Sequence, residues 1–225
     1  MDEAEEREGV ASAVRQLRIE HLLDWTGGAV SQRLDNMRMV ITPGGGARRR
    51  WEISANDLLV VDVLAPPSSV IPRPPIGTAI HSFIYREVPG VGAIVHTHAG
   101  AAYLASCFCD SSLGSLPPTA HLGEIPVLGL TLDDGRHDST PTTQASWVEQ
   151  VTIPQAAQHL TEWKTAISTR GVAFLDFGHG AYTAASSLGA AIIDLARLER
   201  ACQLWLLKAL GLTFPTVQPR PPSRN

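Results

Sequence analysis

The sequence HSFIYREVPGVGAIVHTH, residues 81–98, sets the expected architecture of the chain. The run Thr78–Arg86 predicts a short helix, a Pro-Gly turn follows it, and Gly92–His98 predicts a buried strand. Because residues i and i+2 of a strand point to the same face, the imidazoles of His96 and His98 can converge on one metal ion. Imidazole suits zinc, iron, copper and nickel better than calcium or magnesium. The pair is therefore a candidate metal-binding element.

His179 offers a third imidazole. It follows the expected strand Val172–Phe177 and lies between Gly178 and Gly180, which permit unusual backbone angles and the close approach of another group. A histidine at the end of a strand is well placed to face a site. Three histidines at strand ends would form a three-nitrogen site that leaves positions open for water or substrate. That is the arrangement of a catalytic metal rather than a structural one.

Hydrophobic periodicity predicts further elements on both sides of this centre. Apolar residues recur at helical spacing from Val10 to Leu23, and the paired glycines Gly27 and Gly28 are expected to end that helix. Further helices are expected at Ala99–Cys107, Ile153–Ile167 and Ser187–Leu210, and further strands at Met37–Ile41 and Leu58–Val63. The polar segment 131–143 is expected to be an exposed excursion.

The composition excludes several classes of protein. The chain has 225 residues, of which 44% are hydrophobic and 18% charged, and its net charge is −4. These values are ordinary for a globular domain and exclude dominant disorder, while the absence of a basic excess argues against nucleic acid as a partner. No apolar run approaches the roughly 18 residues that are needed to cross a bilayer, so no membrane is expected as a partner.

The same features indicate the organisation of the chain and its compartment. One domain over residues 1–212 is expected, with a proline-rich tail over 213–225. The acidic N-terminus does not resemble a secretory signal. The chain has three cysteines, and two of them lie only two positions apart, which favours a reduced, cytoplasmic protein over a disulfide-bonded one.

Motifs along most of the chain resemble the class II aldolase/adducin family. The run 81–98 resembles that family's helix with an H..IY pattern and the AvvHtH strand that follows it, and 171–198 resembles its third-histidine segment. The turn Ile41–Gly45 and the strand at 57–62 match in place, so the similarity spans roughly residues 10–210. The resemblance implies an α/β fold, a three-layer α/β/α sandwich around a central, mainly antiparallel sheet.

The resemblance also implies a site and its partners. It assigns His96, His98 and His179 as metal ligands. The implied cofactor is a divalent metal, with zinc first and manganese, cobalt or iron as alternatives. A small-molecule substrate and a homo-oligomer are implied as well, because members of the family commonly assemble as tetramers with sites near subunit interfaces.

The sequence departs from the family pattern where the substrate would bind. Family aldolases carry a catalytic glutamate four residues before the histidine of the H..IY helix, and here that position is Gly77, which cannot transfer a proton. The family's two phosphate-binding turns correspond to Gly28–Ser31 and Thr42–Gly45 here, and both have lost polar groups. Each lost donor removes a hydrogen bond worth about 1.5–3 kcal/mol. What remains for substrate binding is the backbone and one hydroxyl, at Gly28, Ser31, Gly44 and Gly45. We therefore expect a substrate without phosphate.

The missing glutamate favours decarboxylation over retro-aldol cleavage. Retro-aldol cleavage needs a base to deprotonate a hydroxyl, whereas a departing carboxylate is already an anion. The expected activity is that of a metal-dependent carbon–carbon lyase, a decarboxylase or aldolase-type enzyme acting on a small hydroxy, keto or aromatic acid, with the metal stabilising an enolate. A proton donor is still needed, and His121 is the first candidate. The other candidates are His81, Tyr103, Tyr85 and Tyr182.

Two other functions remain open. Three histidines can hold ferrous iron beside a chelating substrate, and one branch of the superfamily resembles such non-heme iron oxygenases. Alternatively, adducin-like members use the fold for protein interaction, although that use goes with loss of the metal histidines, which this chain keeps. Elemental analysis separates zinc or manganese from iron.

Overall fold

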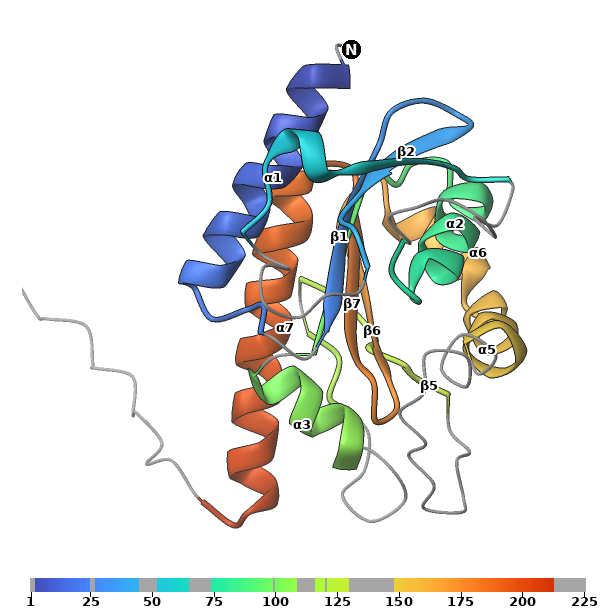
Figure 1. Cartoon of the computed structure of the whole chain (residues 1–225). Coiled ribbons are helices and arrows are strands. Elements are labelled where there is room, and N and C mark those ends of the chain that lie inside the picture. The colour runs from blue at the N-terminus through green and yellow to red at the C-terminus, as the bar shows by residue number, and fades with distance from the viewer. Residues whose placement is uncertain are drawn as a thin grey trace, which may run out of the picture.

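The computed structural model has a seven-stranded sheet between two layers of helices (Figure 1). It describes residues 3–24, 27–44, 52–64, 74–98, 100–108, 116–119, 121–129 and 148–212. The segment 131–143, Gly45 and the expected tail 213–225 lie outside these residues. The three-layer α/β/α sandwich with a mainly antiparallel sheet is confirmed.

The sheet is antiparallel except at one edge. Its strands are β1 (Gly28–Arg33), β2 (Arg38–Ile41), β3 (Leu59–Asp62), β4 (Ala93–Thr97), β5 (Val127–Leu128), β6 (Val172–Asp176) and β7 (Gly180–Ala185). Their order is β3-β2-β1-β4-β7-β6-β5, and only the pair β5 and β6 is parallel. Strand β4, which contains His96, thus lies in the middle of the sheet.

Helices cover both faces of the sheet. They are α1 (Glu3–Ile19), α2 (Thr78–Glu87), α3 (Gly100–Phe108), α5 (Ile153–Ala157), α6 (Leu160–Ala166) and α7 (Leu188–Ala209), with short helical turns η1 (Ala55–Asp57) and η2 (Val148–Thr152). Helices α1, α3 and α7 lie on one face, and α2, α5 and α6 lie on the other (Figure 1). Within the part of the chain that the structure describes, no helix is long and apolar enough to span a membrane.

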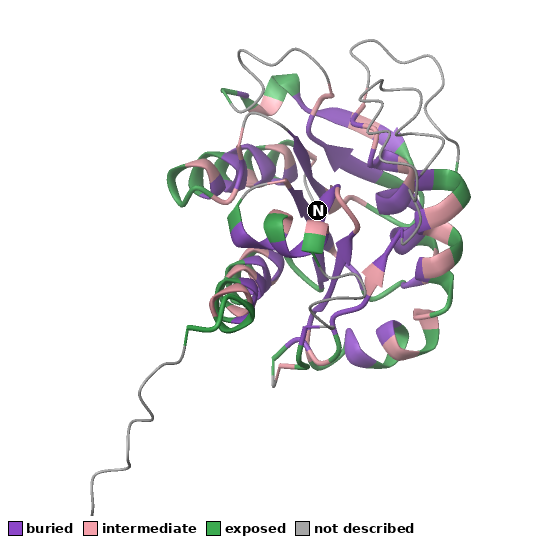
Figure 2. Ribbon diagram, turned by 90° about the horizontal axis from the view of Figure 1, so that it is seen from below, coloured by how far each residue is buried: buried purple, intermediate pink, exposed green. Residues whose placement is uncertain are grey.

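Alternating side chains of the strands build a core on each side of the sheet. On β4, Ile94 packs in the cluster that contains α2 and α6, whereas Ala93 and Val95 pack with α1 and α7. Figure 2 shows the strands buried between helices whose outer sides are exposed. Since His96 lies two residues after Ile94, its ring lies on the α2 side, where it stacks on Tyr182.

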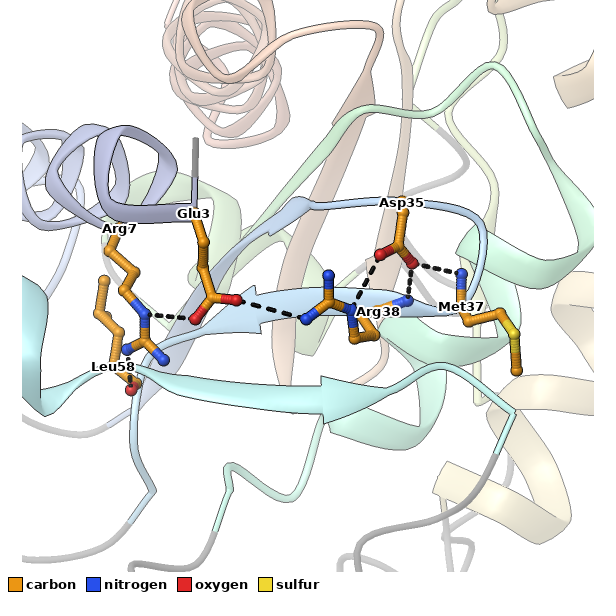
Figure 3. Close-up of polar contacts among 6 residues, drawn as sticks. All are labelled: Glu3, Arg7, Asp35, Met37, Arg38 and Leu58. Carbon is orange, nitrogen blue, oxygen red and sulfur yellow. Dashed lines mark hydrogen bonds and ion pairs between the residues drawn. The ribbon is translucent and has the colours of Figure 1, made fainter. Parts of the chain in front are cut away.

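A chain of polar contacts joins α1 to the edge of the sheet (Figure 3). Arg7 donates to the Leu58 carbonyl at 2.7 Å and pairs with Glu3, which also pairs with Arg38 of β2. Arg38 pairs in turn with Asp35 at 2.8 Å. The side chains of Glu3 and Arg38 are 42% and 50% exposed, so these ion pairs contribute little, and the apolar face of α1 provides most of its attachment.

The first helix is shorter than its sequence predicts. It ends at Ile19 rather than near Leu23. His21 adopts a positive φ of 57°, and the Leu22 amide donates to the Leu17 carbonyl at 2.8 Å. This pattern is a helix C-cap in which the chain reverses, so apolar periodicity continues past the true end of the helix.

Three other elements also differ from the sequence prediction. The helix expected at Ile153–Ile167 is divided into α5 and α6, because the amides of Gln158 and His159 bond carbonyls three residues back. Strands β1 and β7 are not predicted, and β1 includes the segment expected to be a turn at Gly28–Ser31. Both strands are rich in glycine, alanine and polar residues, so pairing with neighbours on both sides, rather than local pattern, makes them strands.

Candidate metal centre

The end of β4 and the turn before β7 bring the three candidate metal ligands together. His96 belongs to β4, His98 follows that strand, and His179 lies in the turn between β6 and β7. Because β4 and β7 are antiparallel, with Thr97 opposite Ala181, the last residues of β4 lie beside the first residues of β7. The long-range pairing of the sheet therefore creates the cluster that the sequence pattern predicts.

The spacing of the three imidazoles suits one metal ion. Their ring centroids are 4.7, 4.9 and 4.7 Å apart, and the candidate ligand atoms all lie within 4.8 Å of one another. The Nε2 atoms of His96 and His98 are 2.9 Å apart. Nitrogens about 2.0–2.1 Å from a tetrahedral zinc ion are separated by about 3.3 Å, so small ring movements would seat one ion. The donor set thus fits a divalent metal with open positions.

Hydrogen bonds fix which nitrogen of two rings faces the centre. His96 Nδ1 lies 3.0 Å from the Ala181 carbonyl, and His179 Nδ1 lies 2.9 Å from Asp176 Oδ2. Since both oxygens accept, each Nδ1 carries the proton and Nε2 is the ligand nitrogen. Burial, together with the nearby His98 and His179, lowers the pKa of His96 well below its usual range, which keeps this ring neutral as a metal ligand must be.

Asp176 supports the centre from behind. Its side chain is fully buried, and its two oxygens accept hydrogen bonds from His179 and, at 2.9 Å, from the Thr152 hydroxyl. Burial raises the pKa of Asp176, and the hydrogen bonds from His179 and Thr152 oppose that shift. A carboxylate behind a histidine ligand orients the ring and raises its basicity.

Replacing Asp176 with asparagine is expected to weaken metal binding without unfolding the chain. Asparagine preserves the shape and one acceptor but removes the charge that supports His179, and loss of such a partner lowers metal affinity roughly 10–100-fold. Competition with a chromophoric chelator would measure the change. An affinity equal to that of the wild type would contradict the supporting role of Asp176.

Several groups hold the segment that carries His98. A side chain at Gly27 would overlap the His98 ring, so only glycine leaves that ring its place. Just beyond His98, Glu199 of α7 accepts hydrogen bonds from the amides of Ala101 and Ala102 at 2.7 and 2.9 Å, which caps the start of α3. The half-buried Tyr103 stacks near the His98 ring with centroids 6.4 Å apart, so the structure brings this candidate proton donor to the edge of the centre.

His81 lies on the α2 side of the centre, deep in the core. Its Nδ1 is 2.7 Å from the Ser31 hydroxyl, which is itself 2.9 Å from the Tyr85 hydroxyl. Ser31, which is expected to bind substrate, is completely buried, and its hydroxyl lies within this network. The His81 ring lies 5.9 Å from that of Tyr182, which stacks on His96. Burial lowers the pKa of His81 to about 3, so this ring is neutral at physiological pH.

The metal-free protein is expected to lose stability as the pH falls below about 6.5. The folded chain does not protonate His81 until about pH 3, whereas the unfolded chain does so near its ordinary pKa of about 6.5. Between these values His81 alone lowers the free energy of unfolding by about 1.4 kcal/mol per pH unit. Urea titrations at several pH values should show this slope reduced in His81→Gln. Equal slopes in the two proteins would contradict the buried, neutral His81.

The structure does not bring His121 to the three imidazoles within one chain. His121 is exposed and lines a cavity with Arg170 and Ser186, where β6 begins and β7 ends, whereas His179 lies at the other end of these strands. Because β5 pairs in parallel with β6, the loop that precedes β5 runs beside the start of β6. We therefore do not propose His121 as the proton donor.

Two of the glycines expected to bind substrate, Gly28 and Gly44, lie close against the backbone of other segments. Gly28 has a φ of +124°, and a Cβ there would lie 2.7 Å from a carbonyl oxygen of β4, so this glycine serves the path of the backbone. Gly44 packs against the backbone of Pro74, in the segment that leads to Gly77 and α2. Gly45, the second glycine of this turn, lies outside the described residues.

The sequence prediction missed Asp176, Gly27 and Glu199, although all three support the centre. Asp176 had a usable signal, because a carboxylate three residues before a candidate histidine ligand can reach that ring across a turn. Gly27 and Glu199 had none, since each reaches the segment of His98 from a distant part of the chain.

The model of one protein family matches most of the chain. The model for the class II aldolase and adducin N-terminal domain matches residues 8–206. The chain belongs to this family. The resemblance drawn from residues 81–98 and 171–198 is thereby confirmed.

Relatives in the class II aldolase/adducin family include enzymes named as dehydratases. A methylthioribulose-1-phosphate dehydratase of Pectobacterium carotovorum is 27% identical over 197 residues, which cover 82% of this chain and 85% of that protein. The protein of the same name from Sodalis glossinidius is 37% identical over 81 residues, but these cover only 36% of this chain and 40% of that protein.

Solved structures show the same fold. YgbL of Klebsiella pneumoniae superposes with a TM-score of 0.66 at 21% identity, covering 92% of this chain and 91% of that one. The L-fuculose-1-phosphate aldolase of Thermus thermophilus superposes with a TM-score of 0.63 at 22% identity, covering 96% and 98%. At these identities the likeness establishes the fold of the family and not a shared substrate.

Proposed function

We propose that the protein is a metal-dependent lyase that cleaves a carbon–carbon bond of a small hydroxy, keto or aromatic acid, with loss of CO2 as the reaction. The convergence of His96, His98 and His179 carries this proposal, because three neutral imidazoles leave coordination positions open for a substrate. The glycine at position 77 favours decarboxylation within the lyase class, since no ionisable side chain stands there to act as a base.

The three histidines would hold a divalent metal, with zinc as the first candidate and manganese, cobalt or iron as alternatives. When bound, such an ion supplies Lewis-acid chemistry, drawing electron density from a carbonyl oxygen and stabilising negative charge that develops on it. Asp176 keeps the His179 ring in its ligand tautomer, and the Ala181 carbonyl does so for His96.

The residues around the centre suggest how a proton would be delivered. Asp176 and Glu199 are both engaged in hydrogen bonds to the protein, so neither is proposed as an acid. Tyr103 is only half-buried and lies beside the His98 ring. We assign it the role of proton donor to the carbon left after CO2 departs, in place of His121. Tyr103→Phe should lower kcat while metal content is retained.

A second candidate function is the elimination of water from a sugar phosphate. The 27% identity to a methylthioribulose-1-phosphate dehydratase over most of both chains favours it. That relative's name indicates a phosphorylated substrate, whereas the losses in the two turns of this chain argue against phosphate. Both reactions would use the same three histidines, so the substrate distinguishes the two functions.

The test is an assay of the purified, metal-loaded protein under nitrogen. Release of CO2 from a panel of 2-keto, 2-hydroxy and dihydroxybenzoic acids is the expected result. Conversion of methylthioribulose 1-phosphate without CO2 release would replace the decarboxylase by the dehydratase. Consumption of oxygen with iron bound would favour an oxygenase, and a protein that binds no metal would favour an adducin-like interaction domain.

We also propose that the chain forms a homo-oligomer, a tetramer by family resemblance. Large apolar side chains on α3 and α7 are about half exposed, which favours burial against another copy. They are Leu104, Phe108 and Leu204. Light scattering coupled to gel filtration should give four chains per particle, and a monomer would overturn this part of the proposal.

A further inference from the structure

A buried threonine lies behind the carboxylate that supports His179. The Thr152 side chain is fully buried, and its hydroxyl donates to Asp176 Oδ1 at 2.9 Å. The other oxygen of the carboxylate, Oδ2, accepts from His179 Nδ1, also at 2.9 Å. Among the described residues these are the two donors to the Asp176 carboxylate. A chain of two hydrogen bonds therefore runs from Thr152 through a buried carboxylate to a candidate metal ligand.

The hydrogen bond from Thr152 determines how the Asp176 carboxylate is turned. The torsion about the Cβ–Cγ bond of an aspartate is broad, so the side chain alone does not select one orientation. Asp176 is the last residue of β6, and pairing with Leu128 of β5 and Gly180 of β7 holds its main chain. With the main chain held, a donor on Oδ1 fixes the remaining torsion and keeps Oδ2 directed at His179.

Thr152 is itself held in place by the turn that contains it. Residues 148–152 form η2, a single π-helical turn that continues directly into α5. Such turns are uncommon and frequently occur at functional sites. Val148, at the start of η2, and Ala156, in α5, are both fully buried in the core on the α2 side of the sheet. The Thr152 hydroxyl thus approaches Asp176 from a packed part of the fold.

Loss of the Thr152 hydroxyl would leave a buried carboxylate without one of its two donors. Asp176 is completely buried, and a buried carboxylate oxygen that lacks a hydrogen bond is costly. The carboxylate is therefore expected to turn toward another donor. That movement would weaken the hydrogen bond to His179, which keeps the proton on Nδ1 and makes Nε2 the ligand nitrogen.

We propose that Thr152 is a positioning residue of the metal centre, whose hydroxyl orients the Asp176 carboxylate so that it holds His179 in the orientation and tautomer that bind the ion. This inference rests on the proposed metal-dependent function and deepens it. It makes the metal affinity of the chain depend on a side chain of η2 whose hydroxyl bonds Asp176 rather than a ligand.

The test removes the hydroxyl and keeps the shape of the side chain. Thr152→Val does so, and valine suits the backbone there, because Thr152 has helical angles of φ −65° and ψ −45°. Zinc affinity is measured by competition with a chromophoric chelator. NMR of the ring nitrogens in the metal-free protein reports which nitrogen of His179 carries the proton, and a His179→Gln spectrum assigns the signals.

Three further variants serve as controls. Thr152→Ser restores the hydroxyl and should rescue both readouts. Thr183→Val removes a hydroxyl that is equally buried but donates to the Ala191 carbonyl of α7, at 3.0 Å. It tests whether the loss of any buried threonine hydroxyl disturbs the centre. In Asp176→Ala, which lacks the carboxylate, Thr152→Val should cause no further loss of zinc affinity.

Thr152→Val should bind zinc about 3–10-fold more weakly than the wild type, which corresponds to one hydrogen bond, and should show a mixture of His179 tautomers. Thr152→Ser and Thr183→Val should match the wild type in both readouts. Wild-type affinity with an unchanged tautomer in Thr152→Val would overturn the role of Thr152 and leave the proposed function standing. An equal loss in Thr183→Val, or an undiminished loss in the Asp176→Ala background, would also overturn it.

The measurement on the metal-free protein separates this inference from the proposed function. A wild-type protein that binds no zinc would count against the proposed function. The tautomer of His179 would still test Thr152 in that case, since its observation needs no ion.

Discussion

Replacing His96 with alanine is expected to remove metal binding and activity together. His96 is the most deeply placed of the three ligands, since its ring is 2% exposed and stacks on Tyr182. Loss of a group that only supports a ligand costs roughly 10–100-fold in metal affinity, so the loss of a ligand should exceed about 100-fold. After dialysis the variant should contain less than a tenth of the metal in the wild type, measured by elemental analysis.

His121→Ala is the matched control for this experiment. His121 is exposed and lies at the opposite end of β6 and β7 from the centre, so its removal should leave the metal content unchanged. Activity that persists in a metal-free His96→Ala protein would contradict the catalytic role of the centre. Metal retained by that variant at the affinity of the wild type would contradict its role as a ligand.

The second large effect is expected from Gly27→Ala, although Gly27 is not itself a candidate metal ligand. A Cβ at Gly27 would lie 2.7 Å from His98 Cγ and closer still to two other ring atoms, so the His98 ring would have to leave its place. Gly27 is not among the glycines with a positive φ, and alanine therefore suits its backbone. We expect metal affinity to fall at least about tenfold, in the range that a misoriented ligand produces.

Isothermal titration with zinc measures this effect, and circular dichroism verifies that the variant is folded. Gly189→Ala serves as the control for adding a methyl group to the chain, because a Cβ there meets nothing within 4 Å. A folded Gly27→Ala protein that binds zinc as tightly as the wild type would show that His98 is not held where the structure has it.

The elements with strong local patterns could be predicted from the sequence. The short apolar run of β4 and the long apolar stripe of α7 predicted those elements correctly to within a residue or two. Strands β1 and β7 could not be predicted in this way, because small and polar residues such as Gly28 and Ser31 give no alternation of large apolar side chains. They are strands because β4 pairs with both of them.

In the candidate site, the metal ligands could be predicted from the sequence more readily than the proton donor. His96 and His98 share a strand face, and His179 follows a strand between two glycines, so local sequence marked each as a candidate, while the family resemblance grouped the three as ligands of one metal. The position of His121 depends instead on the parallel pairing of β5 with β6, a contact between distant segments that no local pattern encodes.

X-ray absorption spectroscopy of the zinc-loaded wild-type protein would show whether the three imidazoles bind one ion, because it counts the ligands of that ion. We expect one zinc ion per chain with three imidazole nitrogens at about 2.0–2.1 Å and at least one further light atom. A spectrum with fewer than three imidazoles, or with sulfur in the first shell, would contradict a site built from residues 96, 98 and 179.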